Sequence, residues 1–166
     1  MMAIESTVLP TQGLGKIQTR HLDRSAVVYV RQSTYQQVLE HRESAAIQYG
    51  LRCRAVEWGW MPDRVVVIDE DQGHSAGSAD GRLGFQRLLA EVGLDRVGIV
   101  LGMEMSRLAR CSKDWHQLLE LCSIFGVLLA DQEGLYDPQH YNDRLLLGLK
   151  GTISEAELHL IRQRSW

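Results

Sequence analysis

Short apolar runs alternate with longer stretches of mixed polarity along most of this 166-residue chain. Runs rich in β-branched residues predict buried strands at about 26–31, 65–68, 97–101 and 127–130. The stretches between them predict helices over 36–49, 82–92 and about 111–125, each followed by a glycine that would end it. Such alternation with short connections is typical of a layered α/β domain. We therefore expect a mostly parallel central sheet of about four to five strands, covered by helices.

The two ends of the chain depart from this alternation. Residues 1–24 contain proline and glycine without a sustained period, which predicts an N-terminal extension or arm. Residues 25–140 would form the α/β domain, in which 131–138 is a loop after the last strand. Residues 141–166 predict a long helix with more leucine and isoleucine than one buried stripe needs. Either this helix contacts a partner helix or another subunit, or it is a well-buried terminal helix.

Composition narrows the class of protein. Apolar residues make up 45% of the chain and charged residues 23%, which is typical of a globular domain. No apolar run approaches the roughly 18 residues that span a bilayer. Three cysteines without C-x-x-C spacing indicate reduced thiols in a cytoplasmic protein, and six scattered histidines form no metal-ligand pattern. The net charge of −3 argues against a free-standing DNA-binding module, but not against a catalytic domain that touches nucleic acid locally.

Polar and charged side chains follow three of the predicted strands. The first strand runs into Arg31 and Ser33, and the second into an acidic, glycine-rich loop that precedes Arg82. The third strand runs into Ser106, Arg107 and, three residues further, Arg110. Parallel neighbouring strands open onto one crevice at their carboxyl ends, so these residues are expected to meet there.

The expected crevice suits phosphate chemistry. Arginine is always charged and offers a planar fork of donors that matches phosphate oxygens. Fixed cations facing those oxygens lower the barrier to phosphoryl transfer. A serine hydroxyl among four arginines therefore fits a nucleophile that attacks a phosphodiester without a metal. Each residue also has an ordinary role: Ser33 could cap a helix, and Arg107 and Arg110 could be solvated surface charges.

Four segments carry a family resemblance. The sequence Tyr29-Val30-Arg31-Gln32-Ser33-Thr34, followed by Gln37, resembles the nucleophile motif of serine recombinases, the resolvase/invertase family. Three later segments resemble further motifs of that family in the same order, namely Asp71–Gly77 with Arg82 and Phe85, Ser106–Arg110, and Ser154–Leu158. Together they cover about residues 25–166 at family-like spacing.

The resemblance implies a resolvase-like three-layer fold and a site for DNA strand exchange. Ser33 would attack double-stranded DNA and form a transient 5′-phosphoserine link without any cofactor or metal. Arg31, Arg107 and Arg110 would bind the scissile phosphate. Supporting roles fall to Arg82, Gln37, Ser75, Asp71 and Ser106.

The family also implies an assembly and a cellular setting. The chain would form dimers and a synaptic tetramer through its C-terminal helix, with a DNA-binding region expected after that helix. It would act at the nucleoid in the bacterial cytoplasm, away from membranes.

Two alternatives remain beside this interpretation. The family commonly has aspartate where this chain has Ser106, so a catalytically degenerate domain that serves assembly or regulation is one alternative. A phosphatase-like or nucleotide-binding α/β domain is the other. Against the latter, the sequence has no P-loop, G-x-G-x-x-G or cysteine nucleophile motif in the required context.

Overall fold

A five-stranded sheet forms the centre of the computed structural model, which describes residues 14–30, 41–69, 83–105, 108–109 and 111–151. The strand order is β2-β1-β3-β4-β5. The strands are β1 (Ser25–Tyr29), β2 (Val65–Ile68), β3 (Val97–Leu101), β4 (Leu128–Ala130) and β5 (Leu135–Tyr136). The first four pair in parallel, and β5 is antiparallel to β4. The expected mostly parallel sheet is confirmed.

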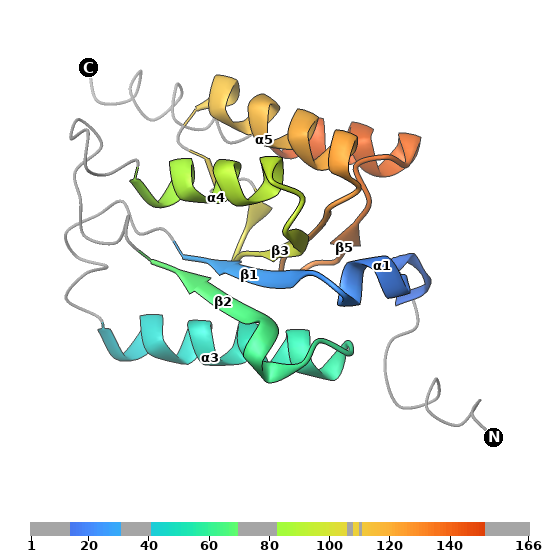
Figure 1. The fold of residues 1–166 in the computed structure, drawn as a ribbon. Coiled ribbons are helices and arrows are strands. Elements are labelled where there is room, and N and C mark those ends of the chain that lie inside the picture. The colour runs from blue at the N-terminus through green and yellow to red at the C-terminus, as the bar shows by residue number, and fades with distance from the viewer. Residues whose placement is uncertain (1–13, 31–40, 70–82, 106–107, 110, 152–166) are drawn as a thin grey trace, which may run out of the picture.

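Helices cover both faces of the sheet, which gives three layers (Figure 1). On one face lies α3 (His41–Glu57). On the other lie α4 (Leu83–Gly93) and α5 (Ser112–Phe125), with the helix 141–151 beside α5. Alternate residues of β1 serve the two layers, because Val27 and Tyr29 join one buried cluster and Ala26 and Val28 the other. Burial on both faces explains why the parallel strands read as continuous apolar runs.

Three strands end together at one edge of the sheet. In the register of β1 with its neighbours, Tyr29 lies opposite Ile68 and Val28 lies opposite Leu101. The backbone N–H of Val30 continues this pairing by donating to the carbonyl of Ile68 over 3.0 Å. The carboxyl ends of β1, β2 and β3 therefore form a common edge, which we call the carboxyl edge.

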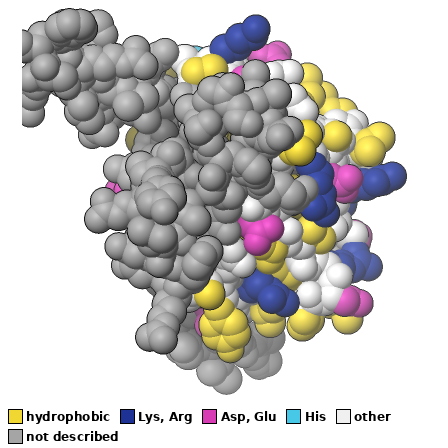
Figure 2. Space-filling model, turned by 90° about the vertical axis from the view of Figure 1, so that its left-hand side faces the viewer, with side chains coloured by type: hydrophobic (Ala, Val, Ile, Leu, Met, Phe, Trp, Pro, Cys, Tyr) yellow, Lys and Arg dark blue, Asp and Glu magenta, His cyan; other side chains and the backbone are white. Residues whose placement is uncertain are grey.

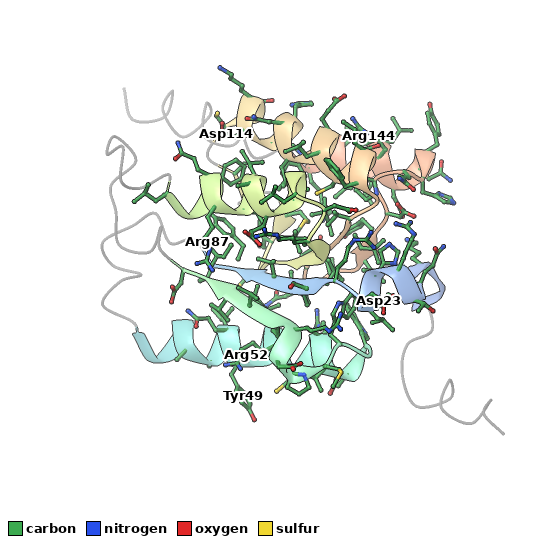
Figure 3. The ribbon with its side chains drawn as sticks, viewed as in Figure 1. Asp23, Tyr49, Arg52, Arg87, Asp114 and Arg144 are labelled. Atoms are coloured by element: carbon green, nitrogen blue, oxygen red, sulfur yellow. The ribbon has the colours of Figure 1, made fainter. Side chains whose placement is uncertain are left out.

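Residues 14–24 pack at the opposite edge of the sheet, which we call the amino edge because the parallel strands begin there. Asp23 follows α1 (Thr19–Leu22) in this segment (Figure 3). His21 is only 1% exposed, and its carbonyl accepts a hydrogen bond from the indole of Trp60 over 3.1 Å. The described part of the expected N-terminal arm is thus packed rather than loose. The sequence pattern missed this because only two apolar residues of the segment, Ile17 and Leu22, pack against the core, and two residues beside polar contacts give no apolar period.

An ion pair ties the same segment to the last described helix. The Lys16 ammonium lies 2.7 Å from the Asp143 carboxylate and donates to the carbonyl of Leu135 over 2.9 Å. Burial alone would raise the pKa of Asp143, but the hydrogen bonds from Lys16 and from the Asp137 backbone N–H lower it below its usual value. The ionised pair therefore joins the N-terminal segment to the end of the domain.

Two boundaries differ from the sequence pattern. The helix expected to stop at Gly50 continues through it to Glu57, because Leu51 and Ala55 beyond it are buried against the sheet. This packing outweighs a glycine penalty of about 1 kcal/mol. The segment 131–138, expected as a loop, contains the two-residue strand β5. By contrast, the predicted glycine stop of α5 is confirmed, since Gly126 adopts a φ of 69° in the left-handed region.

Acid should weaken the fold through His21. Its Nδ1 accepts the Gln18 N–H at 2.9 Å and its Nε2 donates to the Gly126 carbonyl at 3.0 Å, which requires a neutral ring. Burial lowers the pKa of His21 below 6.5, so below that pH the unfolded chain binds the proton more readily. We expect the free energy of unfolding to fall as pH drops through 6.5, by at most about 1.4 kcal/mol per pH unit from this one group.

Urea unfolding at several pH values measures this slope. His21→Gln should flatten it, because the variant lacks the buried imidazole. An equal slope in wild type and His21→Gln would contradict the assignment.

Substitution by alanine should have opposite effects on stability at two glycines. A Cβ at Gly98 would lie 2.1 Å from the backbone carbonyl oxygen of His21, so Gly98→Ala should destabilise the fold by about 1–3 kcal/mol or more. At Gly50, inside α3, nothing lies within 4 Å of the added Cβ, so Gly50→Ala should stabilise the fold by about 0.5–1 kcal/mol. Thermal and urea unfolding of the two variants test the pair. Equal effects would show that the close approach at Gly98 is unimportant.

Candidate active site

The predicted site residues all lie outside the described residues. They are Arg31, Ser33, Gln37, Asp71, Ser75, Arg82, Ser106, Arg107 and Arg110. What the structure describes is the framework from which they follow, namely the ends of β1, β2 and β3. Their mutual placement therefore stays a prediction.

The carboxyl edge brings together the points at which the chain leaves these strands. The last described residue after β1 is Val30, which directly precedes Arg31 in the sequence. The chain leaves β2 at Asp69, which is exposed, and leaves β3 at Gly102, whose N–H donates to the carbonyl of Ala130 over 2.9 Å. All three exits start at one edge of adjacent parallel strands, as the sequence predicts.

The strand order also places β1 at a switch point. The connection from β1 to β2 includes α3 on one face, and the connection from β2 to β3 includes α4 on the other. Open parallel sheets bind ligands where the connections diverge in this way, outside the carboxyl ends of the strands. The chain segment that contains Ser33 begins directly after β1, at this switch point.

Two buried anchors flank the predicted arginine loop after β3. Met105 is 1% exposed and Leu108 is 3% exposed, and both pack into the cluster under α4 and α5. The N–H of Leu108 donates to the carbonyl of Met105 over 3.2 Å. Ser106 and Arg107 are the two residues between these anchors in the sequence. The described backbone around the dipeptide is therefore fixed on both sides.

One polar residue at this edge, Asp131, is not among the residues predicted from the sequence. It directly follows β4, which ends at the same edge as β3 because Leu101 pairs with Ala130. Its side chain is buried, with the residue 2% exposed. The signal was present, because an acidic residue directly follows a fourth apolar run, but the segment 131–138 was interpreted as a loop.

A small ionic cluster surrounds Asp131. Lys150, from the helix 141–151, places its ammonium 3.6 Å from Oδ2 of Asp131 and also contacts the Glu133 carboxylate. Burial alone would lower the pKa of Lys150, but the hydrogen bond to Glu133 and the charge of Asp131 raise it. Burial, and then the Asp131 charge, raise the pKa of Tyr136, whose ring lies 5.5 Å from the Lys150 ammonium. The lysine is therefore held charged and the phenol neutral.

Figure 2 views the molecule from the side on which the carboxyl edge lies, and the described side chains visible beside the grey residues are a mixture of basic, acidic and apolar ones. A hollow of about 300 Å³ lies nearby, between α3 and the segments after β3 and β4, with Arg54, Met103 and Gln132 in its lining. Within the described residues, no group of three or more His, Cys, Asp or Glu side chains could hold a metal ion. No helix in the same part of the chain is long and apolar enough to cross a membrane.

Comparison with known proteins identifies the family. The model of the resolvase N-terminal domain matches residues 26–166. The chain belongs to the resolvase family. A crystal structure of a resolvase family site-specific recombinase from Streptococcus pneumoniae has a similar fold, with a TM-score of 0.58 and 27% identity over 86% of this chain and 93% of that one. The expected resolvase-like fold is thereby confirmed.

Two further proteins are similar to this chain. The uncharacterised protein y4bA/y4pH of Sinorhizobium fredii (strain NBRC 101917 / NGR234) is 54% identical over 149 residues. The match covers 90% of this chain but 22% of that protein, so the chain spans about a fifth of its relative's length. The N-terminal catalytic domain of TP901-1 integrase gives a TM-score of 0.44 at 17% identity, over 82% of this chain and 98% of that one.

Proposed function

We propose that this resolvase-family domain catalyses site-specific DNA recombination, with Ser33 as the nucleophile. The observation that carries the proposal is the common carboxyl edge of β1, β2 and β3, because three of the four family-like segments follow strands that end there. Family membership supplies the reaction class. The S. pneumoniae neighbour is itself described as a site-specific recombinase.

The proposed step is a direct transesterification. The Oγ atom of Ser33 forms a bond to phosphorus while the bond from phosphorus to the 3′ oxygen of the DNA breaks. The proton lost by the serine hydroxyl is balanced by the proton gained on the released 3′-hydroxyl. One phosphodiester replaces another, so the 5′-phosphoserine link retains the bond energy for rejoining and no cofactor is consumed.

The arginines carry the electrostatic part of this proposal. Arg31, Arg107 and Arg110 bind the scissile phosphate and offset the charge that builds on its oxygens, which replaces the role of a metal. Arg82 and Gln37 assist them. The pocket is completed by polar groups that orient the phosphate and its ligands, namely Ser75, Asp71 and Ser106.

Double-stranded DNA is the proposed partner, but the domain alone should bind it weakly. A net charge of −3 gives little counterion release on binding. A separate DNA-binding region after the terminal helix would supply the affinity, in keeping with a relative about four times as long. With DNA as its substrate, the protein would act at the bacterial nucleoid.

Self-association through the terminal helix is part of the proposal. Tyr141, Leu145 and Leu149 are spaced by four residues, so they share one face of the helix 141–151, and they are 74%, 52% and 57% exposed. Leu147 instead is fully buried, and its carbonyl accepts the indole N–H of Trp115 on α5 over 2.8 Å. The helix therefore packs on its own domain and still presents an apolar stripe, which favours contact with a second copy.

A catalytically degenerate recombinase-like module is the second candidate. Ser106 favours it, because the family's usual aspartate would be a candidate proton donor or a group that orients Arg107. Such a module would assemble on DNA with partners but form no covalent link.

Covalent capture of DNA tests the nucleophile. Full-length protein is incubated with a nicked suicide substrate that carries its own crossover site, found beforehand by sequencing DNA bound to the protein in cells. Wild type should accumulate a protein–DNA adduct, and Ser33→Ala should form none, because it lacks the attacking oxygen. Ser123→Ala, at the far end of α5 from the carboxyl edge, should match wild type. Equal adduct from wild type and Ser33→Ala would contradict the assignment, and absence of adduct from both would favour the degenerate module.

Sedimentation equilibrium tests the terminal helix. The mass of the wild-type chain should rise with concentration, and Leu149→Glu should weaken association by about 2 kcal/mol, or roughly thirtyfold. Leu94→Glu is a matched control on the α4–β3 turn, since Leu94 is 58% exposed and Leu149 is 57% exposed. A wild-type monomer at every concentration would contradict the proposed self-association.

A further inference from the structure

Asp131 is a buried carboxylate shared by two loops of the carboxyl edge. Its Oδ1 atom accepts the N–H groups of Glu133 and Gly134 over 2.9 and 3.1 Å and the hydroxyl of Tyr136 over 3.4 Å. These bonds shape its own turn between β4 and β5. The second oxygen, Oδ2, serves a different part of the chain.

Oδ2 of Asp131 accepts the backbone N–H of Met105 over 3.2 Å. Met105 directly precedes Ser106, and Arg107 and Arg110 follow within the next five residues of the sequence. The neighbouring chain segments are also bonded, since the N–H of Gln132 lies 3.5 Å from the carbonyl of Met103. The loop after β3 thus takes part of its backbone position from Asp131.

Lys150 connects this carboxylate to the terminal helix. Its ammonium faces the same Oδ2 atom at 3.6 Å, and its side chain is only 16% exposed. A buried carboxylate that lost its cation would carry a large desolvation penalty. Lys150 therefore places a positive charge beside this buried carboxyl group, whose two oxygens both accept backbone hydrogen bonds. The helix 141–151, through Lys150, and the loop after β3, through Met105, meet at one atom.

The geometry points to Asp131 as a positioning residue for strand cleavage: it sets the loop that leads to Arg107 and Arg110, and Lys150 couples that loop to the terminal helix. This inference rests on the proposed function for its effect on DNA cleavage. Its structural part, the anchoring of Met105, stands independently of the reaction. Small displacements of groups that hold a reacting centre cost about 100-fold in rate, so the anchor should matter even though Asp131 itself does not touch DNA.

Asp131→Asn separates the two roles of the carboxylate, which are shaping its own turn and holding Met105. One amide oxygen still accepts the N–H groups of Glu133 and Gly134, so the turn is retained. The amide NH₂ then faces the Met105 N–H, donor against donor, and loses its attraction for Lys150. A residue with a purely local turn role would tolerate this change, whereas a positioning residue would not.

Full-length Asp131→Asn is compared with wild type by hydrogen exchange of residues 102–109, by DNA affinity and by the first-order rate of adduct formation at saturating protein. We expect faster exchange in this segment, an unchanged Kd for the DNA and an adduct rate lower by about 100-fold. Glu133→Gln is the matched control. It removes the neighbouring exposed carboxylate that contacts Lys150 but makes no bond to Met105, and its rate should equal that of wild type.

If Asp131→Asn shows no cooperative thermal transition and so is not folded, Lys150→Met is measured in its place. It retains the apolar stem and removes the cation, so exchange in 102–109 should again rise and the adduct rate should fall. If a folded variant shows the same hydrogen exchange in 102–109 and the same adduct rate as wild type, the inference is overturned. If wild type itself forms no Ser33-dependent adduct, the proposed function fails, and the exchange measurement alone still decides whether Asp131 anchors the loop.

Discussion

The parallel pairing of β1 with both β2 and β3 is the constraint on which the other features depend. It aligns Tyr29 with Ile68 and Val28 with Leu101, so three chain segments leave the sheet at one edge. The pairing is supported from both sides, since alternate residues of β1 belong to two separate buried clusters. A shift of one residue would exchange these faces and also misalign the exits. Core packing and site assembly are thus consequences of the same register.

The two edges of the sheet are closed by polar contacts of different kinds. At the amino edge, a neutral histidine and backbone carbonyls hold residues 14–24, with His21 bonded to Gly126 and Trp60 bonded to His21. At the carboxyl edge, the side chain of Asp131 holds the loop after β3 by accepting the N–H of Met105. A charge at the carboxyl edge contributes stronger, directional bonds beside segments that the family resemblance assigns to phosphate chemistry.

The helix 141–151 contacts both edges of the sheet. Its first turn is tied to the N-terminal segment by Lys16 and Asp143, its middle packs on Trp115, and its last described turn reaches Asp131 through Lys150. Between these contacts it exposes an apolar stripe. A partner bound to that stripe would act on a helix already connected to the loop that leads to Arg107.

The sequence alone determined the first four strands, the parallel α/β class, the family resemblance and the end of α5 at Gly126, because each follows from local apolar periodicity, turn chemistry or motif spacing. It also showed that polar residues follow three strands. Only the tertiary structure decided that α3 passes through Gly50, that residues 14–24 are packed, and that Asp131 joins Met105 to Lys150. These outcomes depend on contacts between residues far apart in the chain, such as Leu51 with the sheet or Asp131 with Met105. Local patterns carry no information about such pairs, since burial and hydrogen-bond partners are set only when the register of the sheet brings them together.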